Sequence, residues 1–405
     1  MKKILSIAII LLAAATVKAA TFEVKVKNPL KNARKDVPVV IDLKPYGDVK
    51  SAVVTTKDGL TDVPCQVDDL DGDGIADELC FLTDIEGKGT LTFNITTSTE
   101  MATKTYEPRV YAEMLISNKK VKQTNKHDLY ISSLTVENGT NPYWMLHHHG
   151  PAFESELVAY RIYFDHRQTV DIYGKYKEGL ELKETQFYPD NEQKAAGYGD
   201  DILWVGETFG LGTLRGWNGE QPTMIKDVNH RTLKIVAKGP LRTVIEVIDE
   251  GWLPEGYTER IDMKTTYTLY AGHRDCQVSV TFDRAIPEYK FAIGIINVKN
   301  SVEMTDGEGL RGCWGTDWPV SEKDSAGHKR ETVGLGIYIP KTNVAEELPA
   351  DKDNYPYIIS TSTDAIHYAI TFASDNETFG MHSSDAWFEH LRVWKEELEN
   401  PVVVK

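Results

Sequence analysis

The feature that most constrains this fold is an alternation of apolar and polar side chains at every second residue. It is clear in residues 22–27 (FEVKVK) and 90–95 (TLTFNI), and it returns in the second half of the chain. Neighbouring side chains of a strand point to opposite faces of a sheet, so this alternation predicts strands with one buried face. The expected fold is therefore all-β.

Short strands crowd the first hundred residues. Further β-rich runs occupy residues 37–43 (VPVVIDL), 51–56 (SAVVTT), 63–67 (VPCQV) and 78–82 (ELCFL). Strands this short and closely spaced predict a small N-terminal β-sandwich over residues 20–100. The polar stretch 97–107 loses the pattern just before Pro108, so we place the domain boundary there.

Longer strands fill residues 108–405, and they predict one large antiparallel sandwich with the active site. The long β-rich runs are residues 160–165, 232–249, 265–283 and 364–374. Two of these runs contain a turn, at Lys238-Gly239-Pro240 and at Ala271-Gly272-His273. Long hairpins of this kind are typical of a double-sheet sandwich.

One helix is expected near the C-terminus. Its apolar residues are spaced by 4, 3 and 4 positions and are Trp387, Leu391, Trp394 and Leu398. This spacing places them on one helical face, and Ser384-Asp385 just before them predicts the N-terminal cap.

The first nineteen residues have the pattern of a secretory signal. Lys2 and Lys3 precede an apolar run over residues 4–15, and Val17 and Ala19 form a small-residue cleavage site. We therefore predict cleavage near Ala19 and a secreted or periplasmic protein. No later apolar run approaches the roughly 18 residues that span a bilayer, so no membrane span is expected.

Net charge and cysteine content narrow the function classes. Lys and Arg number 45 and Asp and Glu number 61, which gives a net charge of −16 and argues against nucleic acid as a partner.

Four cysteines in an exported chain allow disulfides, and Cys65 and Cys80 lie in strand-like segments joined by a tight turn, where they could pair. No CxxC motif supports redox chemistry.

The sharpest local motif is the acidic run DLDGDGIADE at residues 69–78. Its oxygen ligands would have the spacing of a calcium loop, and they are Asp69, Asp71, Asp73, the Ile75 carbonyl and Asp77. Cys80 stands where such loops carry a bidentate Glu, and strands replace the flanking helices, so this is no EF-hand. A structural calcium ion is one interpretation, and an acidic hairpin turn is the other.

The second motif is residues 142–176, where three histidines precede a dense run of charged and aromatic residues. A strand starting at Glu154 would place Glu154, Glu156 and Tyr160 on one face, with Arg161, Tyr163 and Asp165 on the other. Such density is unusual for a plain surface and points to function. A zinc site using His147, His149 and a distant ligand is a further alternative.

Three later segments are candidates to join it. They are residues 197–217, with Tyr198, Asp200, Asp201, Glu207, Arg215 and Trp217; residues 270–275, with His273 and Arg274; and residues 312–319, with Trp314 and Trp318. The chain has no P-loop, no GxSxG elbow and no HExxH motif, and GLG at 210–212 lacks the dinucleotide spacing. No nucleotide cofactor is therefore expected.

Three stretches together resemble the family called domain of unknown function 4861. They are residues 64–85, 147–175 and 197–217. Its members are secreted proteins of polysaccharide-degrading bacteria, so the resemblance implies work on uronate-containing glycans, as a lyase or a dehydratase. The long-stranded region also resembles the galactose-mutarotase-like sandwich of several polysaccharide lyases.

Elimination from a uronate requires a base, an acid and a cation on the carboxylate. We assign His149 or His273 as base, Tyr160 or Tyr198 as acid, and Arg161, Arg215 or Arg274 as cation. Further candidate contacts to the sugar are His147, Glu156, Trp217, Trp314 and Trp318. The alternatives are a glycoside hydrolase using Glu154 and Glu156 or carboxylates among Asp200, Asp201 and Glu207, a non-catalytic glycan-binding protein, and a sugar epimerase.

Overall fold

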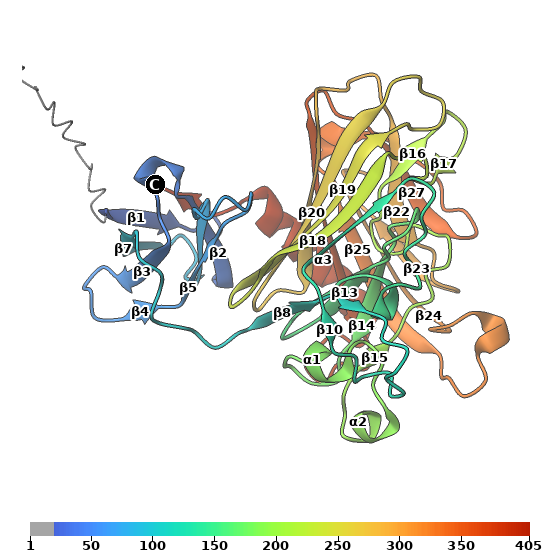
Figure 1. The fold of residues 1–405 in the computed structure, drawn as a ribbon, viewed down its shortest axis with the longest axis horizontal. Coiled ribbons are helices and arrows are strands. Elements are labelled where there is room, and N and C mark those ends of the chain that lie inside the picture. Colours follow the sequence, from blue (N-terminus) through green and yellow to red (C-terminus); the bar gives the residue numbers. More distant parts are fainter. Residues whose placement is uncertain (1–19) are drawn as a thin grey trace, which may run out of the picture.

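The computed structural model describes residues 20–405, so the predicted signal at residues 1–19 lies outside the described chain. Figure 1 shows two lobes, a smaller one mostly from the beginning of the chain and a larger one from most of the remainder. Every ladder between the labelled strands of these residues is antiparallel. The predicted all-β class is confirmed.

The smaller lobe packs two sheets around one apolar core. The first sheet has the order β29 (Val403–Val404), β1 (Thr21–Lys27), β7 (Thr90–Ser98), β3 (Ser51–Thr56) and β4 (Asp62–Val63). The second has the order β2 (Arg34–Asp42), β6 (Glu78–Ile85) and β5 (Cys65–Asp68). The alternation in the sequence is the cause, because β1 buries Val24 and Val26 and exposes the residues between them.

The last residues of the chain return to this first lobe. Val404 of β29 pairs with Val26 of β1, and the Lys405 carbonyl accepts a hydrogen bond from the Lys25 amide at 2.8 Å. Figure 1 shows the C-terminus among the first strands. The small sheet is thus built from both ends of the chain.

The larger lobe contains a nine-stranded sheet. Its order is β11 (Ser133–Glu137), β18 (His230–Lys238), β19 (Arg242–Trp252), β20 (Ile261–Tyr270), β21 (Asp275–Phe282), β28 (Ala365–Ser374), β25 (Glu331–Tyr338), β24 (Leu310–Asp317) and β23 (Val302–Thr305). The runs predicted as long hairpins form β18–β19 and β20–β21.

Two five-stranded sheets share a core with it. One has the order β15 (Asp200–Asp201), β14 (Val170–Gly174), β13 (Ala159–Ile162), β12 (Ala152–Ser155) and β8 (Val110–Glu113). The other has β17 (Pro222–Thr223), β16 (Arg215–Trp217), β22 (Phe291–Ile296), β27 (Asn354–Ile359) and β26 (Val344–Glu347), and β9 (Leu115–Ile116) pairs with β10 (Leu129–Tyr130). Ile172, Val278 and Ile293, one from each large sheet, lie in one buried cluster.

Helix α3 (Ser384–Glu399) confirms the predicted C-terminal helix, although its cap is Ser383, whose hydroxyl accepts the Ala386 amide. Its buried face covers β24 and β25, where a Cβ on Gly336 would lie 2.5 Å from Leu391. Glycine there lets the helix approach the sheet.

The structure adds two short helices, α1 (Leu182–Thr185) and α2 (Asn191–Ala195). No helix within residues 20–405 is long and apolar enough to cross a bilayer.

Polar contacts fix the two lobes against each other. Buried Arg242, at the start of β19, lies 2.7 Å from Asp68 and 2.8 Å from Glu78. Gln66 of β5 accepts the Leu241 amide at 2.7 Å and donates to the Arg242 carbonyl at 3.1 Å. The tip of the β18–β19 hairpin is therefore bound to the smaller lobe.

The four cysteines are free and buried. The hairpin of Cys65 and Cys80 exists, but Cys65 pairs with Phe81 and Cys80 pairs with Gln66. A one-residue offset puts the two thiols on opposite faces of the sheet. The expected disulfide across this hairpin is therefore wrong.

Candidate active site

Arg161 is the centre of a buried polar cluster on β13, β14 and β15, at the lower end of the larger lobe in Figure 1. Its guanidinium lies 2.6 Å from Asp171 and 2.8 Å from Asp201. It also donates to the hydroxyls of Tyr188 at 2.7 Å and Tyr163 at 2.8 Å. The guanidinium of Arg161 is therefore already bound by groups of the protein. Its predicted role in binding the carboxylate of the substrate is corrected.

His149 lies beside this cluster with a defined tautomer. Its Nδ1 is 3.0 Å from the Tyr143 carbonyl, which can only accept, so Nδ1 carries the proton and Nε2 is the acceptor. Its ring stacks on Tyr143 at 3.8 Å. Burial lowers the pKa of His149 to about 4, so the imidazole is neutral at pH 7. A neutral ring with a free Nε2 has the form of a general base.

Arg167 supplies a partly exposed cation next to His149. Its guanidinium packs over the rings of Tyr143 at 5.0 Å and Tyr163 at 4.9 Å, and Asp165 binds one edge at 2.7 Å. Its Nη1 reaches only the Gly206 carbonyl, at 3.4 Å, the outer limit of a hydrogen bond. This nitrogen is available to an incoming anion.

Asp201 is the titratable group of the cluster. Its side chain is 22% exposed. Burial and the neighbouring carboxylate of Asp171 raise the pKa of Asp201 to about 8, because two carboxylates that share Arg161 do not both ionise easily. Asp201 is therefore protonated at neutral pH and has the form of a general acid.

The backbone around the cluster is strained. Five of the eight non-glycine residues with positive φ in the described chain lie here, namely His148, His149, Gln168, Gln186 and Phe187. Gly150 follows the histidines, and a Cβ there would lie 1.8 Å from the Ile162 carbonyl, so only glycine fits. Strain of this kind persists only where surrounding contacts hold it, and it concentrates at functional sites.

The two preceding histidines, His147 and His148, are buried and contact other residues of the protein. His148 Nε2 lies 3.3 Å from Glu113, and both side chains are fully buried. Burial raises the pKa of Glu113 to about 8 and lowers the pKa of His148 to about 3, which favours a neutral pair. Buried His147 stacks on His127 at 4.0 Å. In residues 20–405 no third metal ligand joins His147 and His149, so the zinc alternative has no support.

Exposed tryptophan marks the same region. All eight tryptophans lie in the described chain, and only Trp144 (77% exposed) and Trp204 (50%) are exposed. Trp144 meets His149 edge-on at 5.2 Å, and Trp204 lies in the loop after Asp201. Neither was a predicted contact, because sequence does not show exposure.

The other predicted tryptophans are packed. Trp217 lies against Phe209 and Ile358, and Trp314 packs in the cluster under α3. Trp318 is half-buried with Arg330 over its ring at 5.3 Å. Their predicted sugar contacts have no geometric support in this structure.

The structure does not bring the other predicted catalytic residues to this site. Residues 155–158 form a tight turn between β12 and β13, so Tyr160 pairs with Phe153 and Glu154 pairs with Ala159. The single strand predicted from Glu154 is therefore wrong. Tyr160 is fully buried and donates to the Arg274 carbonyl, and it cannot reach a substrate. The Tyr198 hydroxyl donates to Glu184, away from Arg161.

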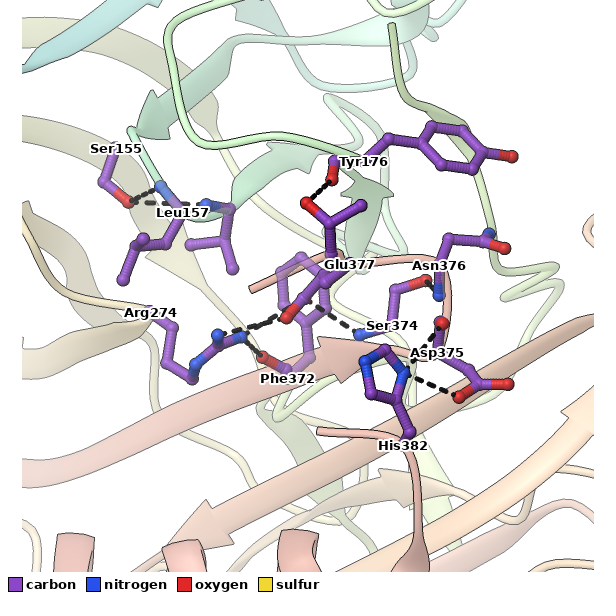
Figure 2. A network of polar contacts seen from close by, with 12 residues as sticks. Ser155, Leu157, Tyr176, Arg274, Phe372, Ser374, Asp375, Asn376, Glu377 and His382 are labelled. Carbon is purple, nitrogen blue, oxygen red and sulfur yellow. Dashed lines mark hydrogen bonds and ion pairs between the residues drawn. The ribbon is translucent and has the colours of Figure 1, made fainter. Parts of the chain in front are cut away.

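The predicted cations Arg215 and Arg274 are structural. Arg215 is 2% exposed and donates to the carbonyls of Arg167 and Thr208 and to Thr169. Arg274 donates to Glu377 at 3.1 Å and to the Phe372 carbonyl at 2.9 Å (Figure 2). The predicted role of each in binding a carboxylate is corrected, because each already has its partners.

His273 and Glu156 belong to the junction of the lobes. His273 Nε2 lies 2.9 Å from the Asp36 carbonyl, and its Nδ1 lies 3.0 Å from Asp275. Arg109 binds both Asp36 and Glu156. Although burial opposes it, the hydrogen bond with Asp275 raises the pKa of His273. His273 therefore helps to join the two lobes, and its predicted catalytic role is corrected.

The two carboxylates of the predicted hydrolase pair, Glu154 and Glu156, are each bound by a cation of the protein. Glu154 is fully buried, 2.6 Å from Lys175, and accepts the Leu182 amide at 2.8 Å. Glu156, in the turn, binds Arg109 and accepts the Gly272 amide at 2.8 Å. Neither carboxylate is free to act on a sugar.

The acidic loop lies in the smaller lobe. Carboxylate oxygens of Asp69, Asp71 and Asp77 lie within 4.8 Å of one another. The Asp73 carboxylate is not part of this group, and it accepts the Ile75 amide at 2.8 Å. Three of the five predicted ligands therefore converge, and calcium binding by them stays a prediction.

If this loop binds calcium, chelation should lower the melting temperature by several degrees, because an ion bound only by the folded state stabilises it. Asp71→Ala should abolish the difference between calcium and chelator. Asp48→Ala, at another exposed aspartate, should keep it. A melting curve that does not respond to chelation would leave only the turn interpretation.

Comparison with models of protein families agrees with the resemblance. The model of a family described as "Domain of unknown function (DUF4861)" matches residues 26–404. No curated protein matches the chain. Among solved structures, an α-mannosidase from Enterococcus faecalis V583 aligns over 95% of this chain and 46% of its own, with 9% identity and a TM-score of 0.44. A protein in glycosyl hydrolase family 38 from Enterococcus faecalis aligns over 97% and 48%, with 9% identity and a TM-score of 0.45. The chain thus spans about half the length of these structures.

Proposed function

The chain belongs to the DUF4861 family, and we propose that it is a carbohydrate-active enzyme that eliminates across a uronate ring of an oligosaccharide, as a lyase or a dehydratase. The observation that carries this proposal is the pairing of a neutral His149 with the cation of Arg167, both packed against Tyr143. Elimination needs these two groups together, because the carboxylate must be neutralised before the neighbouring carbon can lose its proton.

The proposed reaction assigns one role to each group. Arg167 binds the sugar carboxylate through the nitrogen that has only a long contact at present. His149 Nε2 takes the proton from C5, and the electrons of the C5–H bond form the C4=C5 double bond. The C4–O bond breaks, and Asp201 gives its proton to the departing oxygen. Loss of a sugar makes the enzyme a lyase, and loss of water makes it a dehydratase.

Other residues hold this arrangement. Arg215 fixes the Arg167 carbonyl from inside the core, and Arg161 holds Asp201. Exposed Trp144 beside His149 offers a flat apolar surface of the kind that packs against sugar rings. Glu154 and Glu156 are each bound by a cation of the protein, which argues against the hydrolase alternative that uses this pair.

The test is incubation with a panel of uronate-containing oligosaccharides, read by ultraviolet absorbance and by mass. A lyase or dehydratase creates a conjugated double bond that absorbs, and a dehydratase product is also lighter by one water. Shorter products without absorbance would establish hydrolysis in its place. Binding without any product would leave a glycan-binding protein.

The pKa of Asp201 predicts the alkaline limit of activity. The acid works only while protonated and the base His149 only while neutral, so kcat should be constant between pH values of about 4 and about 8 and fall about tenfold per unit above the upper value. Asp201→Asn should lower kcat and remove this limb from the pH profile. Asp200→Asn, at the exposed neighbour that pairs with Lys194, should keep the limb. An unchanged profile in Asp201→Asn would remove Asp201 from the mechanism.

A further inference from the structure

The loop after Asp201 forms one wall of a cavity of about 670 Å³ that the proposed reaction does not use. The loop contributes residues 204–208. The other walls are formed by residues at and after the end of β22 (296, 297, 299 and 300), by residues 352–354 at the start of β27, and by Asp317 at the end of β24. The cavity therefore adjoins the candidate active site along the chain.

The lining combines an aromatic face with many groups that form hydrogen bonds. Trp204 is half-exposed, and the polar lining residues include Glu207, Asp317, Asp353, Asn300 and Lys299. Charges of both signs are present, and the lysines have acidic neighbours, Lys299 at 4.0 Å from Glu322 and Lys352 at 3.6 Å from Asp353. A surface without one dominant charge suits hydroxyl groups better than phosphate or a metal ion.

The walls are held in place from behind. Arg215 donates to the Thr208 carbonyl at 3.1 Å, and the Thr208 hydroxyl donates to the Val205 carbonyl at 2.6 Å. The Asn354 side chain accepts the Phe209 amide at 2.9 Å. Because the loop is fixed at these points, Trp204 is presented without a large cost of ordering on binding.

We propose that this cavity is a subsite for a neutral sugar ring of the same oligosaccharide, stacked on Trp204 with its hydroxyls toward Asp317, Asp353 and Asn300. The subsite rests on the proposed function for the position of the reacting ring, since Arg167 contacts both the candidate active site and the Trp204 loop. Longer substrates would fill it, and a disaccharide at the active site would not.

The test compares chain lengths. Uronate-containing disaccharides and tetrasaccharides are assayed with the wild-type protein, Trp204→Ala, Trp204→Phe and Leu60→Ala, the last removing an exposed apolar side chain of the smaller lobe. We expect a KM for the tetrasaccharide about 3- to 10-fold below that for the disaccharide, the range of one aromatic contact. Trp204→Ala should abolish that advantage, and Trp204→Phe and Leu60→Ala should retain it.

Calorimetry separates a failure of the subsite from a failure of the reaction. Cellotetraose and xylotetraose serve as neutral probes, and their binding needs no turnover. If no elimination is detected, weaker binding of either probe to Trp204→Ala than to Leu60→Ala still supports the subsite. If elimination is detected and Trp204→Ala keeps the full tetrasaccharide advantage, or if neither probe binds and no length dependence exists, the subsite is wrong.

Discussion

Replacing His149 by asparagine should lower kcat for elimination by at least about 10²-fold, the contribution of a general base. Asparagine is chosen because His149 has φ of 68°, a conformation that asparagine adopts more easily than alanine. The backbone is therefore kept while the imidazole is lost. The measurement is the initial rate of double-bond formation at saturating substrate, together with a thermal melt.

Two variants make this result interpretable. His149→Ala should show a similar loss of kcat with a lower melting temperature, because alanine tolerates positive φ poorly. His328→Asn, at an exposed histidine of the larger lobe, should leave both quantities unchanged. A kcat near the wild-type value in His149→Asn would remove His149 from the mechanism, whatever the reaction proves to be.

Replacing Lys175 by methionine should destabilise the protein by about 3–5 kcal/mol. Lys175 and Glu154 are both fully buried and lie 2.6 Å apart. The variant leaves the Glu154 carboxylate without its cation, and burial already raises the pKa of that group. Denaturant unfolding measures the loss. Lys194→Met, which breaks an exposed pair with Asp200, should cost no more than about 1 kcal/mol.

The pH dependence of this loss identifies its cause. Without Lys175, the folded-state pKa of Glu154 lies above that of the unfolded chain, so folding takes up a proton and the deficit grows as pH rises above the unfolded value. The deficit should shrink toward acidic pH, where Glu154 is neutral in both states. A loss that does not vary with pH would reflect packing alone. Since Glu154 also accepts amides at the start of α1, the variant should disturb the segment that carries Tyr188.

Strand positions could be predicted from the sequence because they depend on local periodicity. Residues 51–56 are a strand over that whole range, and residues 78–82 begin β6. The helix over residues 384–399 followed from the spacing of Trp387, Leu391 and Trp394, which are all buried. In each case the signal and the structure involve the same few residues, so no distant contact was needed.

The face of the sheet to which a side chain points could be predicted from alternation only where no tight turn interrupts the strand. The turn at residues 155–158 reverses the chain, so Tyr160 faces the core. In the smaller lobe Cys65 pairs with Phe81, and this offset of one residue from Cys80 separates two thiols that the sequence could have paired. A shift of one position exchanges the faces of a strand, and the turn that sets the shift is decided by what packs around it.

The sequence by itself determined that residues 142–176 are the strongest candidates for chemistry, because their density of ionisable and aromatic side chains exceeds what a strand requires. Only the tertiary structure decided which of them are free to act. Arg161, Arg215 and Arg274 are equivalent as cations in the sequence, yet each is already bound by other groups of the protein, while Arg167 keeps a nitrogen available. Burial, together with Asp171 thirty positions earlier in the chain, raises the pKa of Asp201. The pKa and the exposed fraction of a side chain depend on the groups that surround it in space, and the order of residues in the sequence does not specify those groups.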